Sequence, residues 1–208
     1  MKEVYDFILN NTNLNNDDFV VMGTSGGPDS MALLHLMIAL RDKLHFSIVV
    51  AHVHHNIREE SDEEAKMVED YCNQHHLIFE FKKLEYEKFS ESLGHKMRYD
   101  FFEELIKKYN AKYLFTAHHG DDLIETILMR IVRGSNLKGY AGFETIIDNG
   151  FYKTLRPLVY VTKDEIMDYI NDYNIPYVID ESNNNTIYTR NRYRHNILPV
   201  LKQENNNV

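Results

Sequence analysis

Cysteine is almost absent from this sequence, because Cys72 is the only one among 208 residues. One thiol excludes an internal disulfide and any zinc or redox site of the Cys-x-x-Cys type. Chemistry that relays sulfur through protein cysteines is therefore not expected of this chain.

Long apolar runs are also missing. No window reaches the roughly 20 uninterrupted apolar residues that a membrane-spanning helix requires, and the hydrophobic content of 43% is ordinary for a globular protein. Residues 1–19 are acidic and rich in Asn, and they resemble neither a secretory signal nor a basic transit peptide. These absences predict a soluble protein in the cytoplasm, and the length predicts one compact domain.

The sequence lacks an excess of positive charge as well. It has 23 Lys and Arg residues against 32 Asp and Glu residues, which gives a formal net charge of −9. This balance argues against a broadly basic surface for nucleic acid, while local basic patches remain compatible with it.

The sequence does contain short apolar runs that alternate with longer segments of helical periodicity. This alternation predicts an α/β fold of Rossmann-like type, a five-stranded, mainly parallel sheet with helices on both faces. Two capping-box pairs, Ser61 with Glu64 and Thr162 with Glu165, predict helix starts, and Gly134 predicts a helix end. The expected strands are 19–23, 46–53, 77–84, 112–119 and 175–180.

Two stretches lack a regular pattern. Residues 134–161 contain hairpin-like material, and residues 180–195 form a polar run rich in Asn. Long irregular segments on a regular scaffold often carry function, so both are candidates for a site.

The turn that leaves the first expected strand reads TSGGPDS, residues 24–30. Adjacent glycines let backbone N–H groups approach an anion, and Ser25 and Ser30 add hydroxyl donors. Neither the Gly-Lys-Ser/Thr ending of a Walker A loop nor a Gly-x-Gly-x-x-Gly pattern is present. Asp29 would repel a phosphate unless a cation intervened, which makes it a candidate Mg²⁺ ligand. The alternative is a tight turn in which Asp29 or Ser30 only caps the next helix.

The hexapeptide SGGPDS is similar to the pyrophosphate loop, Ser-Gly-Gly-x-Asp-Ser, of the PP-loop ATP pyrophosphatases that adenylate a carbonyl oxygen. Further segments resemble, in order, the motifs of tRNA(Ile)-lysidine synthetases. They are AHVHHNIREES from Ala51, HHGDDLIETILMRIVRGS from His118, RPL from Arg156 and DESNNNTIYTRNRYRHNILP from Asp180.

The resemblance covers nearly the whole chain and implies a PP-loop catalytic domain at residues 1–208, without the C-terminal tRNA-binding domains of longer family members. The implied reaction uses ATP and Mg²⁺ to join free lysine to the 2-position of the wobble cytidine in tRNA(Ile) with a CAU anticodon. It passes through an adenylated tRNA intermediate and forms lysidine. The resemblance leaves a homodimer open.

The resemblance also implies roles for particular residues. Asp29 and Arg98 would be catalytic, and Asp29 would ligate Mg²⁺. ATP and its pyrophosphate would contact Ser25, Gly26, Gly27, Pro28, Asp29, Ser30, His52, His55 and Arg58. Lysine would contact Asp122, Glu125, Arg190 and Arg194, and the tRNA would contact Arg130, Arg133, Lys138 and Arg192.

Plainer interpretations stand beside these roles. Asp122 and Glu125 share a face of one expected helix and suit the ammonium groups of lysine, or they form a solvated acidic first turn. Arg98 is either a site residue or an exposed position on an amphipathic helix. The arginines of 190–194 are either substrate ligands or a solvated cluster. The histidines lack the spacing of a zinc site; they are His52, His54, His55, His118 and His119.

Two other functions stay open at the level of sequence. One is another adenylating PP-loop enzyme, such as a tRNA thiolase or the synthetase domain of an amidotransferase. The solitary Cys72 argues against thiolases that work through cysteines. The other is a nucleotide-binding module without catalysis.

Overall fold

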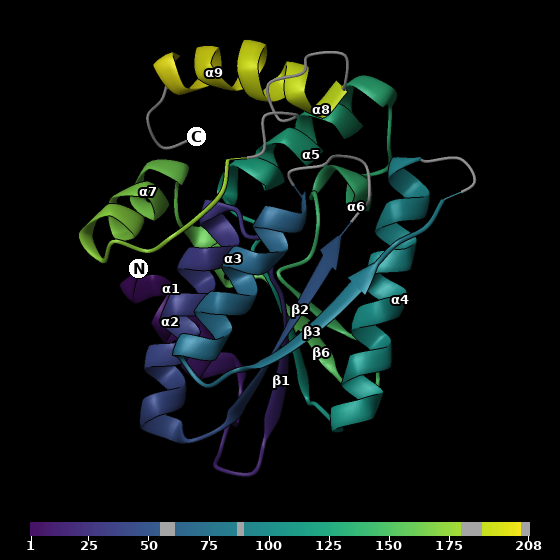
Figure 1. Ribbon diagram of the computed structural model, residues 1–208. Helices are drawn as coiled ribbons and strands as arrows, with labels where there is room; N and C mark the ends of the chain where they lie inside the picture. Colours follow the sequence, from purple (N-terminus) through teal and green to yellow (C-terminus); the bar gives the residue numbers. More distant parts are fainter. Residues whose placement is uncertain (55–60, 87–89, 180–188, 205–208) are drawn as a thin grey trace.

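The computed structural model describes residues 1–54, 61–86, 90–179 and 189–204. One sheet of six strands has the order β3-β2-β1-β4-β6-β5 (Figure 1). All neighbouring strands are parallel except the β5–β6 pair. The strands are β1 (Phe19–Gly23), β2 (Ser47–His54), β3 (Ile78–Lys83), β4 (Tyr113–Thr116), β5 (Ile146–Asp148) and β6 (Lys153–Leu155).

The α/β class and the first four expected strands are confirmed, and the fifth, at 175–180, is wrong. Residues 175–179 form no strand, and residue 180 lies outside the described part of the chain. The position beside β4 is taken by β6, and β5 forms that edge of the sheet; both strands lie in the hairpin expected within 134–161. The apolar Ile175 is buried in the core instead of pairing in the sheet.

Helices cover both faces of the sheet because side chains alternate along the central strands. Val20 and Met22 of β1 face a core shared with α1, α2, α3 and α7, whereas Val21 faces α4. Figure 1 shows the sheet between these two helical layers. The helices of the two layers are α1 (Lys2–Asn11), α2 (Pro28–Leu44), α3 (Ser61–Gln74), α4 (Glu91–Tyr109) and α7 (Lys163–Asp172).

The remaining helices lie over the carboxyl edge of the sheet (Figure 1). The predicted helix end at Gly134 is confirmed with φ +73°, and the Thr162–Glu165 capping box is present at the start of α7. The expected loop at 180–195 is wrong from Thr189 onward, where the chain is helical. These elements are α5 (Gly120–Arg133), α6 (Leu137–Tyr140), η1 (Pro157–Tyr160), α8 (Thr189–Arg192), the π-helical turn η3 (Tyr193–Ile197) and α9 (Leu198–Glu204).

The order of the strands reverses its direction between β1 and β4. From β1 the chain crosses to β2 and β3 on one side, and it later returns to β4 on the other side. Ligands of open α/β sheets bind at such a reversal, beyond the carboxyl ends of the strands. The loops after β1 and β4 meet there. Within the described ranges, no helix has the length and apolar character needed to cross a membrane.

Candidate active site

The loop after β1 is held together by its own serines. Ser30 Oγ donates to the Gly27 carbonyl at 2.9 Å and accepts the Ser25 N–H at 3.2 Å, and the two serine hydroxyls are 3.3 Å apart. Gly27 is the N-cap of α2 and Pro28 is its first residue, with no side-chain cap. The plainer interpretation, a turn whose purpose is a cap by Asp29 or Ser30, is therefore wrong.

Gly26 packs this loop closely against α3 and against the segment at Val178. It has φ +89°, and a Cβ there would lie 3.3 Å from Val68 Cγ2 and 3.4 Å from Met67 Cε. Its carbonyl accepts the Val178 N–H at 2.9 Å. Only glycine combines this backbone conformation with such close packing, so the loop is a compact turn that directs the start of α2 toward the sheet edge.

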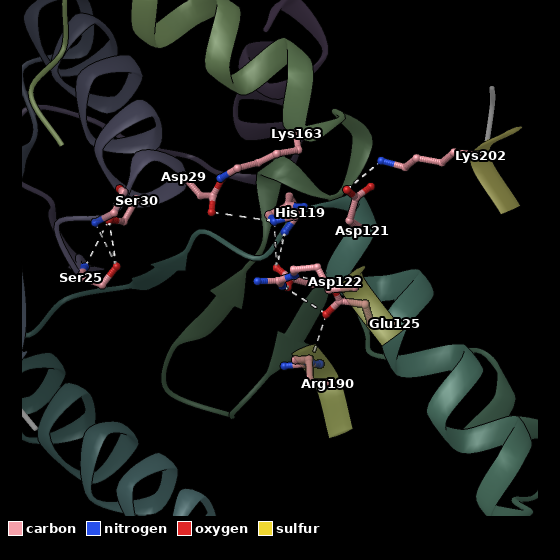
Figure 2. A network of polar contacts seen from close by, with 12 residues as sticks. Ser25, Asp29, Ser30, His119, Asp121, Asp122, Glu125, Lys163, Arg190 and Lys202 are labelled. Carbon is pink, nitrogen blue, oxygen red and sulfur yellow. Dashed lines mark hydrogen bonds and ion pairs between the residues drawn. The ribbon is translucent and has the colours of Figure 1, made fainter. Parts of the chain in front are cut away.

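Asp29 lies at the start of α2 and contacts two residues from other elements (Figure 2). Lys163, the first residue of α7, makes an ion pair with Asp29 Oδ1. His119 Nε2 lies 3.8 Å from Asp29 Oδ2 and 3.6 Å from Asp122 Oδ2. Sequence reasoning missed Lys163; its only signal is the position directly after the capping residue Thr162.

All four residues predicted to bind lysine form one network. Glu125 is fully buried, and its carboxylate accepts from Arg194 Nε at 2.6 Å. Arg194 Nη2 also contacts Asp122 Oδ1 at 2.9 Å, and Arg190 Nε lies 3.3 Å from Glu125 Oε2. The alternative of a solvated acidic first turn is wrong for Glu125, because this side chain is fully buried and pairs with Arg190 of α8 and Arg194 of η3.

Burial and neighbouring charges shift the pKa values of Glu125 and Asp122 in opposite directions. Burial raises the pKa of Glu125, although Arg194 and Arg190 oppose that rise. Burial also acts to raise the pKa of Asp122, but His119 and Arg194 outweigh it and hold this pKa below its ordinary value. Two carboxyl groups of one helix turn thus differ in their affinity for a proton, which is typical of functional sites.

A cationic region lies beyond β4 and β6. Burial, with Arg156, Arg98 and Arg190, lowers the pKa of His118 to about 4, while Asp122 opposes this effect, so the imidazole is neutral at pH 7. The same three arginines act with burial to lower the pKa of His95. These basic groups therefore face a common region, which suits an anionic ligand.

Two of these arginines have donors that the described residues leave unused. Arg156 is 8% exposed and donates through Nη1 to the Glu144 carbonyl, while its Nε has no partner in the described part of the chain. Arg98 is half-buried and lies 5.8 Å from the Tyr99 ring centroid. Within the described residues it donates no hydrogen bond and forms no ion pair. Arg156 belongs to the RPL segment, but sequence reasoning assigned it no role.

The predicted ligands in and after β2, and the basic residues of α5, α6 and α8 that are predicted to contact tRNA, are more dispersed than the groups above. His52 is buried and donates from Nδ1 to the Thr24 carbonyl at 2.9 Å. The predicted ligands His55 and Arg58 lie outside the described residues. Arg130 donates to the Gly139 and Gly142 carbonyls. The other residues predicted to contact tRNA are exposed, namely Arg133, Lys138 and Arg192.

Comparison with known proteins places this arrangement in a family. The model of the PP-loop domain matches residues 2–201. The chain belongs to the PP-loop domain family. This PP-loop chain is 43% identical to a tRNA(Ile)-lysidine synthase of Bacillus cereus, over 99% of the chain and 45% of that relative. It is 40% identical to the tRNA(Ile)-lysidine synthase of Bacillus subtilis, over 100% of the chain and 46% of that relative.

The PP-loop chain thus spans about half the length of the curated relatives that it matches. Among solved structures, it is similar to the U34-tRNA thiolase NcsA of Methanococcus maripaludis, with a TM-score of 0.76. That likeness covers 92% of the chain and 68% of the thiolase at 17% identity. At this identity the likeness shows a common fold.

Proposed function

We propose that this chain is the catalytic domain of an enzyme that joins lysine to the 2-position of the wobble cytidine in tRNA(Ile) with a CAU anticodon, consuming ATP. The observation that carries the proposal is the meeting of two groups at one edge of the sheet: Asp29 of the phosphate loop and the network around Asp122 contact the same His119 ring. The names of relatives with 40–43% identity support it.

The loop of residues 24–30 would bind the phosphates of ATP through its backbone N–H groups, its two serines and the start of α2. Within the described ranges, no group of three or more His, Cys, Asp or Glu side chains could hold a metal ion. Mg²⁺ usually binds through one or two carboxylates together with substrate phosphates and water, so Asp29 of this loop fits such an ion. The ion would offset the negative charge that develops on the departing pyrophosphate.

In the first step, the cytidine 2-carbonyl oxygen attacks the α-phosphate and pyrophosphate leaves. The cationic region of Arg98, Arg156 and Arg190 would hold the substrate nucleotide for this attack. His52 would line the nucleotide side of the loop. His55 and Arg58 are proposed there from the resemblance, and Arg133, Lys138 and Arg192 as exposed contacts for the tRNA.

In the second step, the ε-ammonium of lysine first loses a proton to water, and the resulting neutral ε-amine attacks C2 of the cytidine. A second proton passes from this nitrogen to water, the bond between C2 and the adenylate oxygen breaks, and AMP leaves. Asp122 and Glu125 would orient the ammonium groups of the incoming lysine, and Arg190 or Arg194 would bind its carboxylate. These four side chains now neutralise one another. Lysine binding would therefore exchange contacts within the network rather than add charges to an empty pocket.

The thiolase alternative receives no support from the side chains. Cys72 is buried, and burial raises the pKa of its thiol to about 12. A reactive cysteine needs an accessible thiolate, so this residue is a part of the core and not a sulfur relay.

Incubation of the chain with ATP, Mg²⁺, lysine and tRNA(Ile), followed by mass spectrometry of the anticodon fragment, tests the proposal. The expected result is the mass of lysidine at the wobble position. A methionine-accepting tRNA that has the same CAU anticodon serves as the matched substrate control and should not be modified. Release of pyrophosphate without any change in the wobble base would contradict the proposed product.

A further inference from the structure

Three large apolar side chains are exposed where α5 ends and α6 begins. Ile131 and Val132 are 54% and 73% exposed, and Leu137 is 89% exposed, the largest fraction of any large hydrophobic side chain among the described residues. Residues 131–138 are called the α5–α6 corner below (Figure 1). A single exposed leucine is ordinary, but three such side chains in so short a segment indicate a contact surface.

The corner is held in a fixed conformation, so these side chains do not owe their exposure to a loose segment. The Asn136 side chain caps α6 by accepting the Gly139 N–H at 2.8 Å. Arg130 of α5 donates to the Gly139 carbonyl at 2.9 Å and ties α6 to the preceding helix. Leu137, the first residue of α6, is therefore presented to solvent in one position.

The segment after α6 leads directly back to the candidate site. Gly142 has φ +76°, and a Cβ there would collide with Leu123, the neighbour of Asp122 on α5. Phe143 then packs against the His118 ring, with the ring centroids 5.4 Å apart. The rise of an α-helix puts the end of α5 about 16 Å from Asp122. This distance is a span of a few nucleotides, so one RNA loop can reach both places.

Basic side chains flank the apolar ones. Arg133 is exposed, and the side chain of Lys138 is 90% exposed and 3.9 Å from the Glu144 carboxylate. The corner thus carries positive charge in a chain whose net charge is −9. Double-stranded RNA is contacted mainly through its phosphates and riboses, whereas the unpaired bases of a loop also offer apolar faces. Cations around apolar side chains therefore suit a single-stranded loop.

We propose that the α5–α6 corner binds the anticodon loop of the tRNA, with Leu137 against the face of an unpaired base and Arg133 and Lys138 on the flanking phosphates. The inference rests on the proposed function, and it adds an apolar contact that distinguishes a loop from a duplex. A protein surface is the competing occupant of exposed apolar side chains. The flanking cations favour RNA.

Fluorescence anisotropy tests the proposal with a synthetic RNA hairpin of the CAU anticodon stem and loop, and with a blunt duplex of the same stem. Leu137→Ala should weaken hairpin binding about 3- to 10-fold, because less apolar area is buried, and should leave duplex binding unchanged. Alanine preserves the helix propensity of α6. Leu137→Met should retain most of the hairpin affinity, because its side chain is also long and apolar.

The salt dependence separates the apolar contact from the phosphate contacts. Lys138→Met should weaken binding of the hairpin and reduce the slope of log affinity against log salt concentration by about 1. Leu137→Ala should leave this slope unchanged. A reduced slope in Leu137→Ala would show that the leucine acts only by positioning the charges, which overturns the contact with a base.

Phe151→Ala is a matched control. Phe151 is also apolar and 57% exposed, and Lys107 Nζ lies 5.7 Å from its ring centroid. It precedes β6, however, at the amino edge of the sheet, so its removal should leave hairpin binding unchanged. Equal hairpin affinities in the unaltered chain and Leu137→Ala overturn the proposal. Self-association that Leu137→Ala abolishes, with hairpin binding unchanged, would identify a protein contact instead.

A second measurement uses the unaltered chain. The methyl NMR signals of Leu137, assigned with Leu137→Met, should shift when the hairpin is added, and those of the exposed Leu9 on α1 should not. Unchanged Leu137 signals while the hairpin binds, or no binding of the hairpin at low salt, overturn the proposal even if Leu137→Ala fails to fold. Lysidine formation without dependence on Leu137 refutes this contact alone, whereas absence of lysidine contradicts the proposed function itself.

Discussion

Two parts of the site, the phosphate loop and the ion-pair network on α5, are built in different ways. In the phosphate loop, residues 24–30, the contacts that shape the turn join positions two to five residues apart. In the network, the partners are far apart in the sequence. Arg190 follows Glu125 by 65 residues, and Arg194 follows Asp122 by 72 residues.

The difference shows which part depends on backbone and which on charge. The loop uses a positive φ, hydroxyl groups and a helix start, and its one carboxylate remains partly exposed. The network buries Glu125 completely and relies on two arginines to satisfy it. A charge change should therefore affect folding in the network and ligand chemistry in the loop.

The largest effect is expected from Arg194→Met, which leaves the buried Glu125 carboxylate with Arg190 as its remaining partner. We expect a loss of about 3–5 kcal/mol in the free energy of unfolding, measured by urea denaturation at pH 7. The exposed neighbour Arg192→Met is the control and should change stability by less than about 1 kcal/mol.

The pH dependence of the same variant sharpens the test. Burial already raises the pKa of Glu125, and Arg194 opposes that rise, so the variant should bind a proton in the folded state at a higher pH than in the unfolded state. Its stability should fall as pH rises through the folded pKa. The deficit should be smaller at pH 5 than at pH 8; a constant deficit would show that Glu125 is not responsible.

Asp29→Asn should alter chemistry while leaving the fold in place. Removal of one preorganised electrostatic contact is expected to slow Mg²⁺-dependent adenylation by about 10² to 10³. Stability should change by less than about 1 kcal/mol, because the Lys163 pair is partly exposed. Pyrophosphate release in the presence of tRNA measures the rate, and a near-normal rate would exclude Asp29 as the metal ligand.

Asp122→Asn should separate the two proposed steps. Adenylation of the tRNA is expected to persist, whereas use of lysine should weaken by roughly 1.5–3 kcal/mol, the value of one charged hydrogen bond. Adenylated tRNA is followed first without lysine, and transfer is followed after lysine is added. An equal loss in both steps would place Asp122 in the nucleotide or metal site.

The smallest effect is expected from Gly26→Ala, with Gly150→Ala as its matched control. Both glycines have φ +89°, but a Cβ at Gly150 meets no atom within 4 Å, whereas one at Gly26 meets Val68 and Met67. The shared backbone cost is about 1–2 kcal/mol. Thermal unfolding should show the larger loss of stability for Gly26→Ala, and only this variant should weaken ATP binding. Equal losses of stability in the two variants would show that packing of Gly26 against Val68 and Met67 is not responsible.

Much of the fold was predictable because its signals are local. The central strands are short apolar runs, and the Thr162 capping box and Gly134 are read from neighbouring residues. The expected strand at 175–180 failed because an apolar run does not specify its partner. Leu155 of β6 pairs with β4, and Ile175 packs in the core.

The candidate site was predictable in part. The loop at 24–30 and the carboxylates Asp122 and Glu125 were recognisable by their motifs, but their partners were not. Lys163 gave no motif signal, since a lysine at a helix start is usually solvated. Arg156 lay within a recognised segment without an assigned role. Only the fold shows that its Nε is buried without a partner among the described residues.

The sequence by itself determined the α/β class, the central parallel strands and the turn after β1, because each depends on the conformational preferences of adjacent residues. Only the tertiary structure decided which charges meet. Lys163 contacts Asp29, and Arg194 joins Glu125 to Asp122, across separations of 134, 69 and 72 residues. Such pairings depend on strand order and helix packing, which bring together groups whose sequence positions carry no mutual signal.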